Sequence, residues 1–322
     1  MPECDSHYGN RVISTSAPRQ RLFIVTGKGG VGKTLISTAL AAAFARRGER
    51  TLLVRHSSRD VPHPLLSITQ RYTPSQAQPH LFASRVDGQG AMREYMQRTM
   101  WLPGVYEWFL SGPALVHFTE AAPGFEELMC LGKLYDLATD RSANRFERIV
   151  FDASASGHVA LMLRTPRVTI SAVRSGPLHH NAVKIQGLLE NDLATSVLIV
   201  ALAEEMAVRE AIELERRLRG EDRLHVGPTI VNRLLPLCFA DEEVKGLAAL
   251  QTVSPSLANL RAAATAYHDV GLAQTRNVAS LRQAGLRVLP VNERILPAFD
   301  ASALIDGVAA SLAPLLDGTI RV

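Results

Sequence analysis

The chain has 322 residues, of which 47% are hydrophobic and 20% charged, a composition ordinary for a globular protein with a substantial core. Its 35 basic and 31 acidic residues leave a net charge of +4 without a long basic run, so we do not expect a dedicated nucleic-acid-binding protein. The sequence has no apolar run of about 18 residues and no apolar segment typical of a secretory signal, so we expect neither a transmembrane segment nor export.

The three cysteines, Cys4, Cys130 and Cys238, are far apart and form no CxxC pair. This spacing argues against a zinc site or a disulfide framework, and it fits a reducing cytoplasm. Residues 1–20 mix Pro, Ser, Arg and Asn without periodicity, which predicts a disordered leader. We expect residues 21–322 to form one domain.

A glycine-rich loop with the sequence GKGGVGKT occupies residues 27–34. The apolar residues 21–26 before it predict a short strand, and the Ala- and Leu-rich residues 35–47 after it predict a helix that stops at Gly48. A glycine-rich loop between a strand and a helix is the context that the Walker A motif, or P-loop, requires. A chance glycine-rich turn is the alternative interpretation.

The residue types of this loop suit a nucleoside triphosphate. Glycines let backbone N–H groups turn inward around a phosphate chain without Cβ clashes. Lys33 would place a positive charge on the β- and γ-phosphates, Thr34 would offer a hydroxyl to magnesium, and the helix N-terminus would add its dipole. The predicted nucleotide-binding residues of the loop are Gly27, Gly29, Gly30, Val31, Gly32, Lys33, Thr34 and Leu35.

Lys28 follows the first glycine of the loop, at a position where an ordinary P-loop accepts almost any residue. This second lysine resembles the deviant Walker A motif of the MinD, ParA, nitrogenase-reductase and ArsA group. The resemblance implies that Lys28 reaches across a dimer interface to the partner's phosphates. The alternative is a solvated loop lysine.

After the first helix, residues 51–54 predict a buried strand, and the run RHSSRD at residues 55–60 follows it. The segment after this strand is where switch I, which places the attacking water, is expected. Residues 61–80 are rich in Pro, Ser and Gln and predict a loop, and residues 81–86 predict another strand.

Residues 91–139 predict a helical region in which Pro-Gly pairs separate the helices. Met92, Met96 and Met100 recur every four residues and therefore share one helix face. Packing against the sheet is one interpretation, and an adaptable apolar groove for a hydrophobic helix is the other. The region also contains the aromatic residues Tyr95, Trp101, Tyr106, Trp108, Phe109, Phe118 and Phe125.

Residues 148–151 predict a strand that ends at Asp152, the position of a Walker B carboxylate that holds magnesium-bound water. Ser156, Gly157 and His158 follow and predict a mobile switch II loop that senses the γ-phosphate. The alternatives are that Asp152 is only a helix N-cap and that His158 is an ordinary histidine near a helix start.

Further strands are predicted at residues 196–200, 226–231 and 287–291, and helices at 208–219, 243–284 and 301–315. Because strands and helices alternate, we expect an α/β fold with a doubly wound, mostly parallel sheet of the P-loop NTPase type. We expect an inserted α-helical subdomain formed by residues 91–139 and 243–284. Without a second P-loop, one chain supplies one nucleotide site.

Five segments resemble the anion-transporting ATPase family, which includes ArsA and the ATPases that target tail-anchored membrane proteins. The match looks closest to the bacterial branch that has a single P-loop and no zinc site. The segments are GKGGVGKT at residues 27–34, AAPGFEELMCLGKLYDL at 121–137, FDASASGHVALMLRTP at 151–166, ALAEEMAVREAIELERRLR at 201–219 and VNRLLP at 231–236.

The resemblance implies a dimeric ATPase that binds ATP and Mg²⁺. Asn232 would hydrogen-bond adenine, Pro290 and Val291 would pack on the adenine ring, and Asp152 would act in the magnesium shell. The nucleotide state would open or close an apolar helical surface for a hydrophobic client helix or a membrane-associated protein. The partner subunit would be a second copy or a related ATPase.

The chain departs from the family at switch I, where the family places an aspartate that orients the hydrolytic water. Ser57 stands at that position, and Asp60 lies three residues later as the alternative catalytic carboxylate. Serine does not accept the proton of water as a carboxylate does, so we expect slow hydrolysis by this chain alone. The cysteines do not match the arsenite-binding set, and the intersubunit CxxC of the eukaryotic targeting ATPases is absent.

Three other classes stay open. A regulatory subunit would bind ATP without hydrolysing it and would work in a hetero-oligomer. A MinD- or ParA-type positioning ATPase would need a C-terminal amphipathic membrane helix or a basic DNA-binding patch, and residues 301–322 carry almost no Lys or Arg. An iron–sulfur reductase would need two cluster cysteines per chain, and only Cys130 is suitably placed.

Overall fold

The computed structural model describes residues 19–99, 124–153, 156–236, 240–249, 254–294 and 298–318. Within them, eight strands form one sheet in the order β10-β9-β8-β1-β7-β2-β6-β5. Every neighbouring pair is parallel except β5 with β6 at one edge. The strands are β1 (Leu22–Gly27), β2 (Thr51–His56), β5 (Ser75–Gln78), β6 (Leu81–Val86), β7 (Arg148–Asp152), β8 (Thr195–Leu202), β9 (Thr229–Leu234) and β10 (Val288–Asn292).

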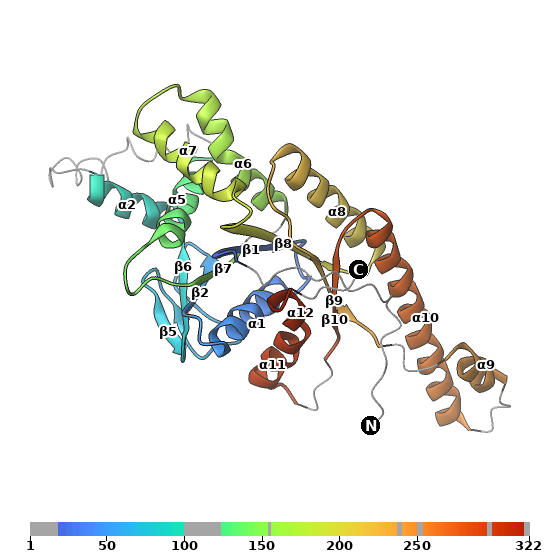
Figure 1. The fold of residues 1–322 in the computed structure, drawn as a ribbon. Helices are drawn as coiled ribbons and strands as arrows, with labels where there is room; N and C mark the ends of the chain where they lie inside the picture. Colours follow the sequence, from blue (N-terminus) through green and yellow to red (C-terminus); the bar gives the residue numbers. More distant parts are fainter. Residues whose placement is uncertain are drawn as a thin grey trace.

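Helices cover both faces of this sheet (Figure 1). One face packs on α1 (Lys33–Arg46), α11 (Ala301–Ser311) and α12 (Ala313–Leu316). The other packs on α5 (Phe125–Thr139), α6 (Ser156–Ala172), α7 (Pro177–Glu190), α8 (Glu205–Arg216) and part of α2 (Gly88–Thr99). A short π-helix, η1 (Arg217–Glu221), extends α8. The doubly wound, mostly parallel α/β fold is therefore confirmed.

The alternation of buried side chains along the central strands produces the two layers. In β1, Leu22 and Ile24 contact the core under α5 and α6, whereas Phe23 and Val25 contact the core under α1. Successive residues of a strand point to opposite faces, so both faces of a central strand are apolar. β1 shows this directly, since all six of its residues are buried.

Two segments differ from the sequence expectation. Residues 61–80, predicted as a loop, contain the short ribbon of β3 (Val61–Pro62) and β4 (Thr69–Gln70) and the edge strand β5. Gly157 and His158, predicted in a loop, lie in the first turn of α6, and residues 154 and 155 are outside the described part. The apolar positions Val159, Met162 and Leu163 hold this helix on the sheet, because all three are buried in the core.

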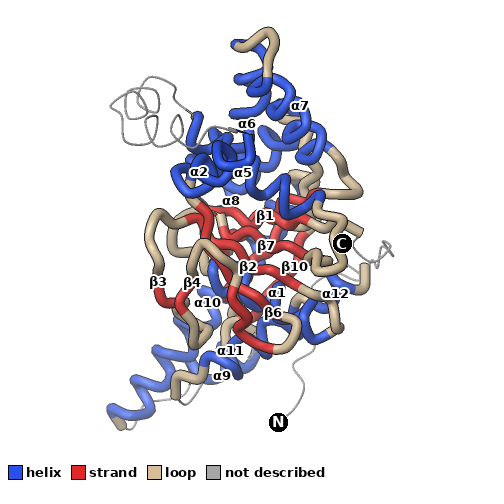
Figure 2. The backbone as a smooth tube through the Cα atoms, turned by 90° about the vertical axis from the view of Figure 1, so that its left-hand side faces the viewer, coloured by secondary structure: helices blue, strands red, loops and turns tan. Residues whose placement is uncertain are grey.

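The two predicted helical segments lie at different ends of the molecule. α2 and α5 pack together, and α5 also packs on α6 and α7. α9 (Asp241–Ala249) and α10 (Pro255–Gln283) project from the side of the sheet that carries β9 and β10, away from α2 and α7 in both views (Figures 1 and 2). No described helix is both long enough and apolar enough to cross a membrane.

The methionine stripe of α2 packs on the core where it is described. Met92 is buried, and Met96 packs against the same core as α5 and α6. Met100 and the aromatic residues Trp101, Tyr106, Trp108, Phe109 and Phe118 lie outside the described residues. For Met92 and Met96, core packing is therefore the interpretation that the contacts support.

Candidate nucleotide-binding site

The P-loop joins the carboxyl end of β1 to the first turn of α1, and two of its glycines leave no room for a side chain. A Cβ on Gly27, whose φ is +151°, would lie 2.1 Å from the carbonyl oxygen of Val200 on β8. A Cβ on Gly32, whose φ is +95°, would lie 2.4 Å from Nδ2 of Asn232. The loop therefore needs glycine for conformation and for close packing.

Lys33 folds back across this loop. Its Nζ donates hydrogen bonds to the carbonyl oxygens of Gly27, at 3.1 Å, and Lys28, at 2.9 Å. Burial lowers the pKa of Lys33, and the charge of Asp152 acts in the opposite direction. The predicted phosphate-binding cation thus lies at the loop with two backbone carbonyls as its partners.

Thr34 and Asp152 are in direct contact. The Thr34 hydroxyl donates to Oδ2 of Asp152 at 2.8 Å, and Oγ of Ser37, which also donates to the Lys33 carbonyl, lies 3.3 Å from Oδ1. Burial raises the pKa of Asp152, and the hydrogen bond from Thr34 and then the charges of Arg55 and Lys33 oppose this rise. Two hydroxyls beside a buried carboxylate are oxygen donors of the kind that Mg²⁺ prefers.

Ser37 is a further candidate site residue that the sequence motifs did not predict. It lies one helical turn after Lys33, so it shares the face of α1 that carries Thr34 toward the sheet. A hydroxyl four residues after the P-loop lysine is the signal that could have identified it.

Lys28 leaves the loop in the direction of α8. Its Nζ lies 3.6 Å from Oε2 of Glu210, and both side chains are substantially exposed, at 49% and 39%. Exposed ion pairs of this kind contribute about 1 kcal/mol or less. Lys28 can therefore leave Glu210 at little cost.

Asn232 lies on β9, beside the P-loop on the side opposite Asp152. Its side chain is buried, and Nδ2 donates to the carbonyl of Val31 at 2.8 Å. The Asn232 amide thus holds the backbone of the loop in place. The predicted hydrogen bond to adenine did not include this contact with the protein itself. Pro290 and Val291 lie on β10 next to β9, and Val291 is fully buried in the core under α1 and α11.

His158, from the predicted switch II, stacks on His56 at the end of β2. The ring centroids are 5.6 Å apart with an interplanar angle of 23°, and Nε2 of His158 lies 3.9 Å from Oε1 of Glu127 on α5. Burial, and then the neighbouring charge of His158, lower the pKa of His56. These contacts connect the end of β2, the start of α6 and α5.

The two candidate switch I residues have other partners. The Ser57 hydroxyl donates to the carbonyl of Arg59 at 2.9 Å. Asp60 accepts a hydrogen bond at 2.6 Å from Nε of Arg85 on β6, which lies on the far side of β2 from the P-loop strand. Arg85 also pairs with Asp87. Asp60 is therefore held toward β6.

Cys130 lies on α5 and is fully buried in the core. Burial raises the pKa of its thiol, so the thiol stays protonated. Its position inside the apolar core, with no exposed surface, argues against the iron–sulfur alternative. Cys4 and Cys238 lie outside the described residues.

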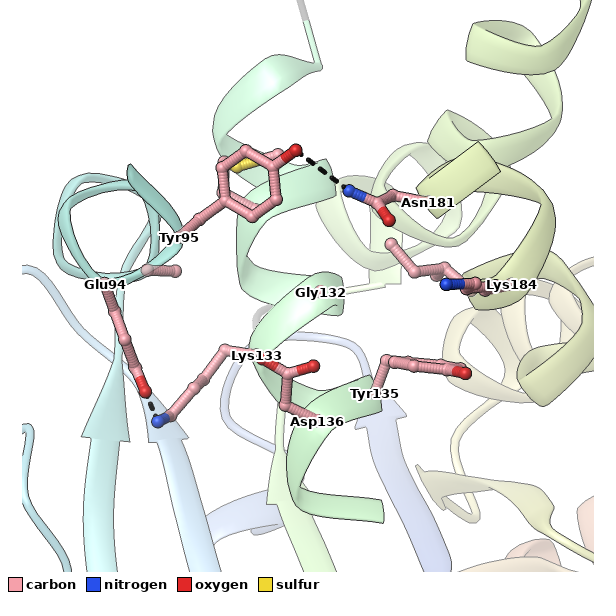
Figure 3. Close-up of a pocket in the computed structure, with 11 residues that line it drawn as sticks. Glu94, Tyr95, Gly132, Lys133, Tyr135, Asp136, Asn181 and Lys184 are labelled. Carbon is pink, nitrogen blue, oxygen red and sulfur yellow. Dashed lines mark hydrogen bonds and ion pairs between the residues drawn. The ribbon is translucent and has the colours of Figure 1, made fainter. Parts of the chain in front are cut away.

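A separate cavity of about 150 Å³ lies between α2, α5 and α7 (Figure 3). Nζ of Lys133 pairs with Glu94 across one side at 2.6 Å, and Nδ2 of Asn181 donates to the Tyr95 hydroxyl at 3.1 Å. Ala91, Met129 and Ile185 add apolar surface. This described part of the helical region is therefore a mixed polar and apolar pocket.

Comparisons with known proteins agree with this geometry. The family profile described as anion-transporting ATPase matches residues 20–176. The chain is 30% identical over 232 residues to ATPase BagA of Mycobacterium tuberculosis, covering 67% of this chain and 66% of the relative. It is 28% identical over 279 residues to ATPase GET3B of Arabidopsis thaliana, covering 70% of this chain and 67% of the relative.

A third relative is the arsenical pump-driving ATPase of Acidiphilium multivorum, which is 27% identical over 316 residues. This match covers 89% of this chain and 54% of the relative. The chain thus spans between 54% and 67% of the length of these three relatives. The profile match begins just before β1 and ends just after α6, so it includes the P-loop and Asp152. Residues 20–176 therefore match the anion-transporting ATPase family, and the likeness to its named relatives extends over two thirds or more of the chain.

Proposed function

We propose that the chain is an ATP-binding, dimeric ATPase of the ArsA and tail-anchor-targeting type, working in the cytoplasm. The observation that carries this proposal is the hydrogen bond from Thr34 to Asp152 beside a glycine loop that holds Lys33. Together these groups provide a cation for phosphates and oxygen donors for a divalent cation at one edge of the sheet.

The residues fit MgATP. The glycines at 29 and 30 have open space where a Cβ would point, so phosphates can approach the loop backbone there. Lys33 would bind the β- and γ-phosphates, and Thr34 with Asp152 would hold Mg²⁺ directly or through water. When bound, Mg²⁺ neutralises charge that develops on the phosphate oxygens.

Dimerisation is the second part of the proposal. Lys28 is exposed on the loop, and among the described residues its side chain pairs with Glu210 in a weak ion pair. We propose that it leaves Glu210 and binds the phosphates of a partner subunit, which is a second copy or a related ATPase.

The third part of the proposal concerns a hydrophobic client helix. The stacked pair of His56 and His158 connects the nucleotide edge of the sheet to α5, which packs on α2 and α7. We propose that this route transmits the nucleotide state to the helical region, which then opens or closes a surface for a hydrophobic helix. Hydrogen exchange over residues 91–139 should differ between apo and MgATP-bound protein, and identical exchange would leave only core packing.

A second candidate function is a regulatory subunit that binds ATP and hydrolyses it poorly. The observation that favours it is the pairing of Asp60 with Arg85. It adds to the family resemblance, which implies an aspartate at the position where Ser57 stands. Such a subunit would close with a partner that carries an intact switch I.

Calorimetry with MgATP tests the core of the proposal. Lys33→Ala should weaken ATP binding by about 10- to 100-fold, since charge-assisted contacts contribute about 1.5–3 kcal/mol. Lys184→Ala, which removes an exposed lysine of α7, is the matched control and should bind like the parent. Equal affinity of Lys33→Ala and the parent would show that the loop is not the phosphate site.

A further inference from the structure

Arg55 is a cation at the nucleotide edge that the assignments above leave without a role. It lies at the carboxyl end of β2, in register with Asp152 of the adjacent β7. Neighbouring residues in register on parallel strands point to the same face of a sheet. The face is identified by Leu53, two residues earlier, which contacts the core under α1. Arg55 and Asp152 therefore both point toward the α1 side.

The charge of Arg55 acts on this face. It is one of the charges that lower the pKa of Asp152 against the effect of burial, and after burial it is the cause that lowers the pKa of His63. Yet its guanidinium makes no hydrogen bond or ion pair with any described residue. A half-buried arginine with five unused donors is suited to a planar or tetrahedral anion.

The order of the strands in the sheet indicates which anion Arg55 would bind. From one side to the other, the relevant strands are β9 with Asn232, β8, β1 with the P-loop, β7 with Asp152, and β2 with Arg55. If the base lies on the Asn232 side, the phosphate chain runs across the P-loop toward β7 and β2. Two strand spacings separate β1 from β2, a distance of about 10 Å that a long side chain and a phosphate chain can bridge.

We infer that Arg55 binds the terminal phosphate of ATP from within its own chain and thereby makes the site prefer ATP over ADP. This inference rests on the proposed ATP binding and deepens it. The role is distinct from that of Lys28, which is proposed to act on the partner's nucleotide, and from that of Lys33, which reaches the β-phosphate as well.

The test is the ratio of ATP to ADP affinity, measured by calorimetry with Mg²⁺. Arg55→Ala should weaken ATP binding by about 10- to 100-fold, the loss expected for charge-assisted hydrogen bonds, with ADP affinity unchanged within about twofold. Arg55→Lys should keep part of the preference for ATP over ADP, because lysine keeps the positive charge but lacks the planar set of guanidinium donors. Arg71→Ala removes an exposed arginine outside the P-loop and the switch segments, and it should bind both nucleotides like the parent.

The outcomes separate the two proposals. A parent chain that binds neither nucleotide overturns the proposed function. A parent that binds both, with Arg55→Ala weakening ATP and ADP equally or not at all, overturns only the inference about Arg55, because the arginine would then act on Asp152 or have no role in the site. Thermal unfolding without nucleotide checks the fold of each variant, and Arg55→Gln, which keeps most of the side-chain length, replaces Arg55→Ala if that variant does not fold.

Discussion

The Nε2 atom of His63 lies 3.3 Å from Oγ1 of Thr38, and this contact joins the segment after β2 to the helix that follows the P-loop. Nδ1 of His63 accepts hydrogen bonds from the backbone N–H groups of Leu65 and Leu66, at 3.1 and 3.0 Å. Nδ1 must therefore be unprotonated, and the proton of the neutral ring is on Nε2, from which it is donated to Thr38. Thr38 in turn donates to the carbonyl of Thr34 at 2.6 Å.

The first prediction is a loss of stability in acid through His63. Burial, and then the charge of Arg55, lower the pKa of His63 to about 4 from 6.5. The unfolded chain therefore binds more protons than the folded one between these values, and stability falls as pH decreases from about 6.5 to about 4. The loss is up to about 3 kcal/mol.

His63→Asn keeps an acceptor near Nδ1 without the titration, so the free energy of unfolding of this variant in urea should fall less steeply between pH 6.5 and pH 4. Parallel curves for parent and variant would contradict the assignment.

The second prediction compares two glycines of the P-loop. Gly27→Ala should destabilise the fold by about 2–4 kcal/mol, because its Cβ would collide with the carbonyl of Val200. Gly29→Ala is the matched control, since no atom lies within 4 Å of the position of its Cβ. Chemical denaturation without nucleotide measures both, and equal midpoints for the two variants would refute the close approach of β8.

The third prediction concerns Ser57. Ser57→Asp should raise Mg²⁺-dependent ATP turnover by about 10²–10⁴-fold, the range that a positioned acid–base group contributes. Ser58→Asp adds the same charge one residue later and should leave turnover near the parent value. Rapid hydrolysis by the unmodified chain that Asp60→Ala abolishes would instead make Asp60 the catalytic carboxylate, in spite of its pairing with Arg85.

The fourth prediction separates the two partners of Lys28. Lys28→Ala should still bind ATP as a monomer but should lose ATP-dependent dimerisation, measured by light scattering with size exclusion. Glu210→Gln removes the cis partner of Lys28 and should change the stability of the monomer by less than about 1 kcal/mol while dimerisation persists. Loss of dimerisation in Glu210→Gln but not in Lys28→Ala would reverse the roles.

Local patterns account for what the sequence predicts well. Glycine spacing predicts the loop between β1 and α1, and the apolar run before Asp152 predicts β7, because both signals lie within a few residues. The binding roles of the loop and of Asp152 stay predictions. The edge strand β5 is half exposed and lacks apolar alternation, so its sequence resembles a loop. The start of α6 has the same problem, since an Ala, Ser and Gly run hides a helix whose buried residues begin at Val159.

Contacts between segments that are far apart in the chain could not be predicted from the sequence. The register of β2 with β7 places Arg55 beside Asp152, and the stacking of His56 on His158 joins two strand ends. Neither follows from periodicity, because each depends on which strands become neighbours. The family resemblance supplied roles for Asn232 and Val291 but not the contacts that both residues make with the protein itself.

The hydrogen bond from Asn232 to Val31 spans 201 positions of the chain. The P-loop is commonly described as a local motif, yet here the amide of a strand far along the sequence holds its backbone in place. During synthesis, the loop cannot acquire this brace until residue 232 has left the ribosome and β9 has joined the sheet. The nascent amino-terminal half therefore contains the motif before the loop is held in its final conformation. With ATP bound as proposed, the nucleotide can stabilise the domain only late in its assembly.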